Sequence, residues 1–188
     1  MNFEEDIINC LAVLNNGGLI LYPTDTIWGI GCDALNESAI QKIFSLKKRM
    51  PEKSMIILVA ERSAVNEFTE GANEHIFSEI ELKNQPTTVI YEKAKSLPSV
   101  LINEDGSIAI RVVQDSFCRA LINRFKKPLV ATSANISGTL TPLSFDSISD
   151  EIKNGVDYIV QHRRDEKNYN LPSAIIKLNQ DGSISKIR

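Results

Sequence analysis

Aromatic residues, histidines and long apolar runs are all scarce in this chain. Only 6% of its 188 residues are aromatic, and its two histidines, His75 and His162, each stand alone in a polar or charged segment. A histidine metal cluster is therefore not expected, because such a site needs several ligands close together. No apolar run approaches the ~18 residues of a membrane span, and the acidic start MNFEEDIINC is unlike a signal peptide. We expect a cytoplasmic protein.

Several common catalytic and structural motifs are also missing. The three cysteines, Cys10, Cys32 and Cys118, have no C-x-x-C spacing, so neither a disulfide framework nor a cysteine zinc site is expected. The chain has no G-x-x-x-x-G-K-[ST] phosphate loop and no G-x-S-x-G nucleophile elbow. The segment GIGCDA at 29–34 matches G-x-G-x-x-A, but PTDTIW separates it from the preceding strand. We interpret its glycines as loop residues and not as a dinucleotide-binding turn.

The charge balance offers little attraction for a polyanion. There are 21 basic and 24 acidic residues, a formal net charge of -3, so nucleic-acid binding would need a local basic patch. A content of 43% hydrophobic and 24% charged residues is typical of a globular protein. Because no linker, repeat or low-complexity tract interrupts the chain, we expect a single domain over residues 1–188.

Helical and strand patterns alternate irregularly. Helices are expected over 3–15 behind Asn2, from Asn36 to a basic last turn at Lys47, over 116–125 behind Asp115, and as one or two short segments within 61–83. Strands are expected at 19–22, 55–60, 87–91, 107–113, 128–131, 156–161, 173–178 and 183–187. The last two flank Asp181-Gly182, which indicates an antiparallel hairpin. The pattern predicts an α/β or α+β domain around a mixed sheet.

Three polar segments stand at the ends of expected strands. YPTDT at 22–26 offers hydroxyls and loop amides to a small polar ligand, and ATSANISG at 131–138 allows backbone N–H groups to approach a phosphate or forms an ordinary polar loop. KKRMPEK at 47–53 either directs cations toward a cleft or is the solvated end of a helix. Arg111 lies inside an apolar strand, so it needs an anionic partner, either a ligand or an internal carboxylate.

These segments, taken together, resemble the YrdC-like family. YPTDTIWGIGCDA, LKKR before an apolar strand, IAIRV, ATSANISG and the closing LPSAIIKL and KIR occur in the family's order over nearly the whole chain. The resemblance implies an open, twisted mixed sheet with flanking helices and a concave basic cavity. It also implies the short form of the family, without an additional C-terminal domain.

The family's reaction implies an enzyme, a nucleotidyltransferase. L-threonine, bicarbonate and ATP form threonylcarbamoyl-AMP and pyrophosphate, and downstream threonylcarbamoyl-transfer machinery uses the product to modify tRNA. The resemblance therefore implies ATP as a substrate, Mg²⁺ with the nucleotide, no resident metal, and no membrane partner. Weak direct binding of tRNA and the oligomeric state are left open.

The resemblance also assigns residues by position. The family's K-x-R and S-x-N pairs fall on the catalytic candidates Lys47, Arg49, Ser133 and Asn135. The ATP-binding candidates are Arg49, Lys53, Ser107, Ser133, Thr141 and Arg188. The threonine-binding candidates are Thr26, Arg111, Ala131 and Ser173, with Arg111 holding the carboxylate.

The sequence departs from the family pattern at four places. Met50 separates Arg49 from Pro51, Gln85 stands in an altered tryptophan-proline-glycine segment, and Val113 replaces a proline. Leu58 stands where some members have a threonine-contacting histidine, which leaves amino-acid selectivity open. Two rival functions remain: an RNA-binding module of the same fold, and a paralogue with another carbamoylation role, such as the carbamoyl-transfer domain of hydrogenase maturation proteins, whose zinc-finger segments are absent here.

Overall fold

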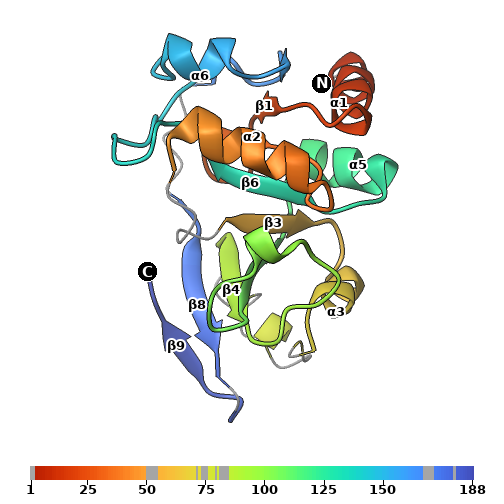
Figure 1. Cartoon of the computed structure of the whole chain (residues 1–188), viewed down its shortest axis with the longest axis vertical. Helices are drawn as coiled ribbons and strands as arrows, with labels where there is room; N and C mark the ends of the chain where they lie inside the picture. Colours follow the sequence, from red (N-terminus) through yellow and green to blue (C-terminus); the bar gives the residue numbers. More distant parts are fainter. Residues whose placement is uncertain are drawn as a thin grey trace.

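A strongly twisted sheet forms the centre of the protein (Figure 1). The computed structural model describes residues 3–49, 55–70, 72, 76–78, 80, 85–166, 172–179 and 181–188. Within them nine strands are ordered β7-β1-β2-β6-β3-β5-β4-β8-β9. The strands are β1 (Ile20–Tyr22), β2 (Gly29–Gly31), β3 (Ile56–Val59), β4 (Thr87–Tyr91), β5 (Ile108–Val112), β6 (Leu129–Ser133), β7 (Tyr158–Ile159), β8 (Ala174–Leu178) and β9 (Ile184–Lys186).

The sheet is mixed, as the sequence predicts. The pairs β1–β7, β3–β5 and β4–β8 are parallel, and the other neighbouring strands are antiparallel. In Figure 1, β6 and β3 run across the view whereas β4 and β8 run along it. The twist that strands normally accumulate across a sheet accounts for this change of direction.

Helices flank the sheet. They are α1 (Glu4–Asn15), α2 (Glu37–Lys47), α3 (Val65–Phe68), α5 (Ser116–Phe125), α6 (Asp150–Asn154) and the 3₁₀ segments η1 (Arg62–Ala64) and η2 (Ser99–Leu101). The predicted caps of α2 and α5 are confirmed: Asn36 accepts a hydrogen bond from the Ala39 N–H at 3.1 Å, and Asp115 accepts one from the Cys118 N–H at 2.8 Å. Asn2 lies outside the described residues, and Phe3 holds the N-cap position of α1 without a side-chain hydrogen bond.

The glycines at 29 and 31 do not lie in a loop, so that interpretation of the sequence is wrong. They form β2, which pairs with β1 on one side and β6 on the other. A Cβ on Gly31 would lie 2.7 Å from both the Tyr22 ring and the Val130 carbonyl oxygen. Glycine is needed because backbone and ring approach it closely. Since GIG is a strand and not a strand-to-helix turn, the dinucleotide-binding alternative is excluded.

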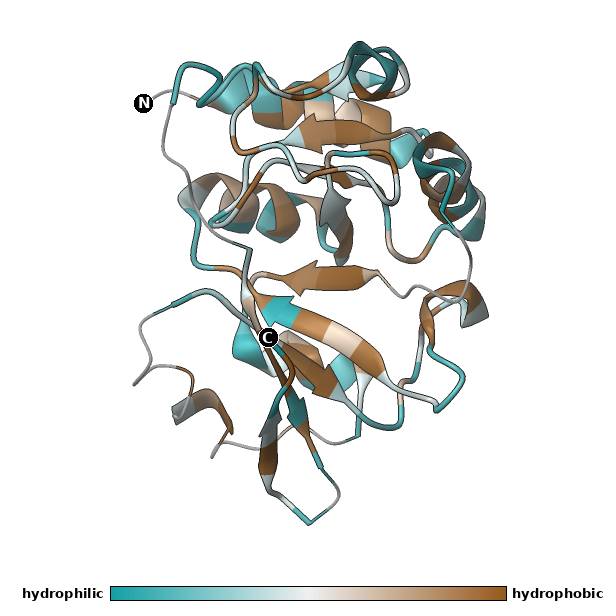
Figure 2. Ribbon diagram, turned by 90° about the vertical axis from the view of Figure 1, so that its left-hand side faces the viewer, coloured by the Kyte–Doolittle hydropathy of each residue, from teal (hydrophilic) through white to brown (hydrophobic). Residues whose placement is uncertain are grey.

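The terminal strands and the core agree with the expected pattern. β8 and β9 form the predicted antiparallel hairpin, with Ile176 opposite Lys186. This hairpin projects from the rest of the sheet (Figure 2). The three cysteines are buried and unpaired. Short α6, which the sequence analysis did not predict, covers the end of the sheet near β7. None of the described helices is long and apolar enough to cross a membrane.

Candidate active site

One face of the twisted sheet is hollowed into a cavity of about 320 Å³. Its floor follows the alternation of strand side chains: Thr88 and Ile90 of β4 and Ala109 and Arg111 of β5, each pair two residues apart, point to the same face. The loop at 24–27, the end of β6, the segment around Thr141 and the C-terminal Arg188 form the walls. The volume lies in the range of small-ligand sites in proteins.

Most of the residues predicted from the sequence meet in this cavity. The lining includes the predicted residues Thr26, Arg49, Arg111, Ala131, Ser133, Thr141, Ser173 and Arg188. They come from segments separated by up to most of the chain, so the cavity is formed by the tertiary structure. Their roles in binding or catalysis stay predictions. Lys53 lies outside the described residues.

Arg111 has the internal carboxylate that the sequence left open. Its guanidinium Nη2 lies 3.1 Å from Asp25 Oδ1, and these side chains are only 5% and 10% exposed. Its Nη1 donates to Thr26 Oγ1 at 3.3 Å. Among the described residues, Arg111 Nε and Asp25 Oδ1 still have no hydrogen-bond partner. A buried N–H group without an acceptor costs free energy, so the Arg111 Nε–H favours a ligand that accepts its hydrogen bond. Arg111 therefore retains the capacity to bind a carboxylate.

Hydroxyl groups surround this end of the cavity. Thr24 Oγ1 donates to the Ile27 carbonyl at 2.8 Å, accepts from the Thr26 N–H at 3.1 Å and lies 2.9 Å from Thr26 Oγ1. Two further hydroxyls of the lining, Thr88 Oγ1 and Ser173 Oγ, are 2.8 Å apart. Together with Arg111 they suit a small, hydroxylated amino acid. Asp25, Thr24 and Thr88 are not among the residues predicted from the sequence; the first two lie in YPTDT, which the sequence indicates only as a segment.

Lys47 does not line the cavity. Its side chain is 1% exposed, and its Nζ donates to the carbonyl oxygens of Ser133 and Asn135, the latter at 2.6 Å, and to Asn135 Oδ1 at 3.4 Å. Burial, assisted by the charge of Arg49, lowers the pKa of Lys47 to about 7. In this structure the lysine therefore connects the end of α2 to the loop after β6, and its catalytic role stays a prediction.

The loop after β6 is shaped by short-range polar contacts. Ser133 Oγ donates to Asn135 Oδ1 at 2.5 Å, and Asn135 Nδ2 donates to the Thr139 carbonyl at 2.7 Å. The Ser137 N–H also donates to the Lys47 carbonyl at 2.8 Å. The Asn135 side chain thus makes these hydrogen bonds within the loop, whereas Ser133 also lines the cavity. The S-x-N pair supports loop geometry as well as offering polar groups.

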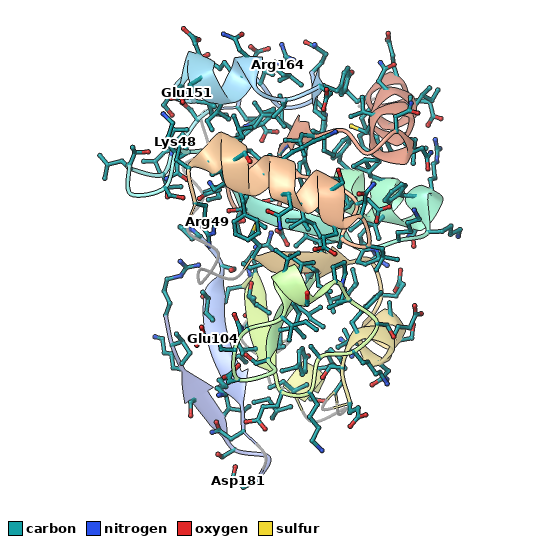
Figure 3. The ribbon with its side chains drawn as sticks, viewed as in Figure 1. Lys48, Arg49, Glu104, Glu151, Arg164 and Asp181 are labelled. Carbon is teal, nitrogen blue, oxygen red and sulfur yellow. The ribbon has the colours of Figure 1, made fainter. Side chains whose placement is uncertain are left out.

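The cavity is basic. Arg49, Arg111 and Arg188 contribute to its lining, and no described carboxylate does. Arg188 donates from Nε and Nη2 to the Ser173 carbonyl at 3.2 and 3.0 Å, which brings the end of the chain to the cavity. Figure 3 shows Arg49 where the end of α2 approaches β8. Partial burial lowers the pKa of Arg49, but arginine stays charged near neutral pH. The cavity therefore favours anionic ligands.

Ser107 and the two altered positions Leu58 and Val113 also lie away from the cavity. Ser107 is buried at the start of β5, where its Oγ accepts from Asn103 Nδ2 at 2.9 Å, so it does not reach the lining. Leu58 is fully buried beside Arg111 in the sheet and offers no polar contact. The Val113 N–H donates to the Val59 carbonyl at 3.0 Å, a bond that a proline cannot make. Met50 lies outside the described residues.

Comparisons with known proteins agree with this architecture. The family model Sua5/YciO/YrdC, described as "Telomere recombination", matches residues 12–188. The threonylcarbamoyl-AMP synthase of Hydrogenovibrio crunogenus is 32% identical over 130 residues, which cover 67% of this chain and 70% of that protein. The protein of the same name from Idiomarina loihiensis is 34% identical over 146 residues, covering 76% of this chain and 78% of its own length.

Solved structures show the same fold. P. abyssi Sua5 complexed with L-threonine superposes with a TM-score of 0.86 at 25% identity, covering 98% of this chain and 54% of that one. This chain therefore spans about half the length of that Sua5. E. coli YciO superposes with a TM-score of 0.81 at 21% identity and covers 98% of this chain and 88% of its own. Because the matched family model extends over nearly the whole sequence and the fold agrees, the chain belongs to the Sua5/YciO/YrdC family.

Proposed function

We propose that this protein is an L-threonylcarbamoyladenylate synthase, which joins L-threonine, bicarbonate and ATP to give threonylcarbamoyl-AMP and pyrophosphate. One observation carries the proposal: a single cavity combines buried Arg111, whose Nε has no hydrogen-bond partner among the described residues, with nearby hydroxyl groups and with the cations Arg49 and Arg188. The first group suits a hydroxylated amino acid, and the second suits a triphosphate. The names of the relatives support the same activity.

In this proposal the first substrate binds at the Arg111 end of the cavity. The Arg111 guanidinium binds the threonine carboxylate, and the neighbouring hydroxyls of Thr26 and Ser173 donate to or accept from the ligand's polar groups. The amine then combines with bicarbonate to form a carbamate, with loss of water. A carboxylate held by a rigid strand directs this carbamate toward the nucleotide, which lowers the entropic part of the barrier.

The second step is transfer of the adenylyl group. A carbamate oxygen attacks the α-phosphorus, the bond to the β-phosphate oxygen breaks, and pyrophosphate leaves. Negative charge on the phosphate oxygens is stabilised by Arg49 and Arg188, and the Ser133 hydroxyl adds a neutral hydrogen bond when it rotates from Asn135 Oδ1 to the phosphate. No protein nucleophile is needed because the substrate itself attacks. Lys47 donates to the carbonyl oxygens of Ser133 and Asn135 and so holds the loop after β6 in position.

Magnesium enters with the nucleotide in this proposal. The described residues contain no group of three or more histidine, cysteine or acidic side chains that would hold a metal, and the cavity lining offers no carboxylate. These residues fit a metal carried on phosphate oxygens and not a resident ion. The product, a mixed anhydride, would be consumed by a downstream threonylcarbamoyl-transferring enzyme.

The test is pyrophosphate release by the purified protein with ATP, Mg²⁺, bicarbonate and L-threonine. Release should require threonine and should fall strongly in Arg49→Ala. The matched control is Lys48→Asn, since Lys48 carries the adjacent charge but pairs with Glu151 at the surface at 2.8 Å. Asparagine tolerates the left-handed conformation of this position, where φ is 50°. Threonine-independent release would contradict the assignment.

A non-enzymatic RNA-binding role is examined in the same preparation. Titration with tRNA at increasing salt should give weak binding that disappears at moderate ionic strength, because the net charge is -3 and the cavity brings together few cations. Tight, salt-resistant tRNA binding without pyrophosphate release would favour the RNA-binding function instead.

A further inference from the structure

The side chains of Arg163, Asp115 and Glu166 form a polar cluster that contacts the 24–27 loop but does not line the cavity. Its centre is Arg163, whose side chain is only 16% exposed. Arg163 Nη1 donates to the Thr24 carbonyl at 3.2 Å and to Asp115 Oδ2 at 2.9 Å, and its Nε donates to Glu166 Oε2 at 2.6 Å. One guanidinium thus joins the 24–27 loop, the start of α5 and its own turn.

The backbone at Arg163 is unusual as well. Its φ is 67°, in the left-handed region that side-chain-bearing residues rarely adopt. Such a conformation persists when the surroundings hold it, and here the three side-chain hydrogen bonds do so. Arg163 is therefore placed by its contacts and is not a surface residue that happens to lie near an acid.

The two carboxylate oxygens of Asp115 accept hydrogen bonds from different groups. Oδ1 accepts from the Cys118 N–H and caps α5, while Oδ2 accepts from Arg163. Because α5 is a ten-residue helix with a buried apolar face, its first turn is a firm anchor. Because Arg163 Nη1 donates to both Asp115 and the Thr24 carbonyl, it fixes the position of this carbonyl relative to α5.

The 24–27 loop continues this contact into the cavity. Thr24 Oγ1 accepts from the Thr26 N–H and lies against Thr26 Oγ1, and Thr26 Oγ1 in turn accepts from Arg111 Nη1. A shift of the Thr24 carbonyl would therefore displace Thr26 and release Arg111 from one of its two orienting contacts. The nucleotide end, formed by Arg49 and Ser133, shares none of these bonds.

We propose that Arg163 is a positioning residue for the amino-acid end of the cavity: through the Thr24 carbonyl it fixes Thr26 and the orientation of Arg111. This inference rests on the proposed function for its substrate, threonine. Loss of Arg163 raises the KM and the dissociation constant for threonine and leaves the KM for ATP nearly unchanged. Because a charge-assisted hydrogen bond is lost at partly buried groups, the increase is roughly tenfold or more.

Three variants test the proposal. Arg163→Gly removes the side chain at a φ that glycine adopts without strain. Arg163→Lys keeps the charge but cannot reach three acceptors with a planar fork, so it restores part of the affinity. Asp115→Asn keeps an oxygen for the cap of α5 but presents an N–H to Arg163, so it breaks the ion pair without uncapping the helix.

The matched control is Arg119→Ala. Arg119 lies on α5 and pairs with Glu61 at 2.6 Å, with half-exposed side chains, so its loss removes the same charge without touching the 24–27 loop. For each protein, threonine binding is measured by calorimetry, and KM and kcat are measured for threonine and for ATP. Hydrogen exchange of the 24–27 segment is measured without any ligand, and the Thr26 amide should exchange faster in Arg163→Gly and Asp115→Asn.

The outcomes separate this inference from the proposed function. If the wild type releases pyrophosphate but Arg163→Gly and Asp115→Asn bind threonine with wild-type affinity, or if their constants for ATP and for threonine change equally, the role of Arg163 is refuted. If the wild type neither binds threonine nor releases pyrophosphate, the proposed function fails, and unchanged exchange of the Thr26 amide then refutes the anchoring role on its own. Should Arg163→Gly not fold, Asp115→Asn decides.

Discussion

Replacing Arg111 by methionine separates its structural contact from its proposed contact with threonine. The substitution keeps a long apolar stem in β5 but removes the guanidinium. Asp25, which is 10% exposed, then loses its cation, and breaking such a buried pair typically costs ~3–5 kcal/mol of stability. The lost bond to a threonine carboxylate is worth about 1.5–3 kcal/mol, which corresponds to a ~10- to 150-fold weaker affinity.

A compensating variant distinguishes the two effects. In Asp25→Asn with Arg111→Met, no unpaired charge is left in the interior, so most of the lost stability should return. Threonine affinity should not return, because the carboxylate-binding group is still absent. Stability is measured by urea unfolding, and affinity by calorimetry with L-threonine at a protein concentration where the variant is folded. Wild-type affinity in Arg111→Met, or recovery of both properties in the double variant, would refute the reasoning.

The other predictions concern the nucleotide end and the sheet. The pKa of Lys47 is lowered to about 7 by burial but has its ordinary value of 10.5 in the unfolded chain, so the unfolded state binds the extra proton between these values. Lys47 should therefore add up to ~1.4 kcal/mol per pH unit to the free energy of unfolding above pH 7, and Lys47→Met should remove this contribution, so the free energies of wild type and variant in urea unfolding should differ by an amount that changes between pH 7 and pH 9. An equal slope in both proteins would contradict the lowered pKa of Lys47. Gly31→Ala should cost ~1–3 kcal/mol in thermal unfolding, because its Cβ would meet the Val130 carbonyl at 2.7 Å, and an unchanged midpoint would contradict the close approach. Arg49→Lys should raise the KM for ATP but not for threonine, because lysine cannot bind phosphate oxygens in a fork; equal effects on both substrates would argue against its place at the nucleotide end.

Local signals in the sequence were sufficient for the elements whose ends are set by nearby residues. Asn36 and Asp115 predicted the starts of α2 and α5, because a cap acts on N–H groups two or three residues away. Asp181-Gly182 predicted the β8–β9 hairpin for the same reason, since a tight turn brings its own strands together. The family motifs also named most of the residues that line the cavity.

Contacts between distant segments decided everything else. No local pattern shows that Gly29–Gly31 is a strand, because glycine is tolerated there only where Tyr22 and Val130 approach. Likewise the K-x-R motif names Lys47 as a catalytic candidate, whereas its contacts with the carbonyls of Ser133 and Asn135 follow from how the end of α2 packs against the loop after β6. Residue types and short-range order could be read from the chain alone, whereas the partner of each buried polar group depends on a fold that brings together residues as far apart as Thr24 and Arg163.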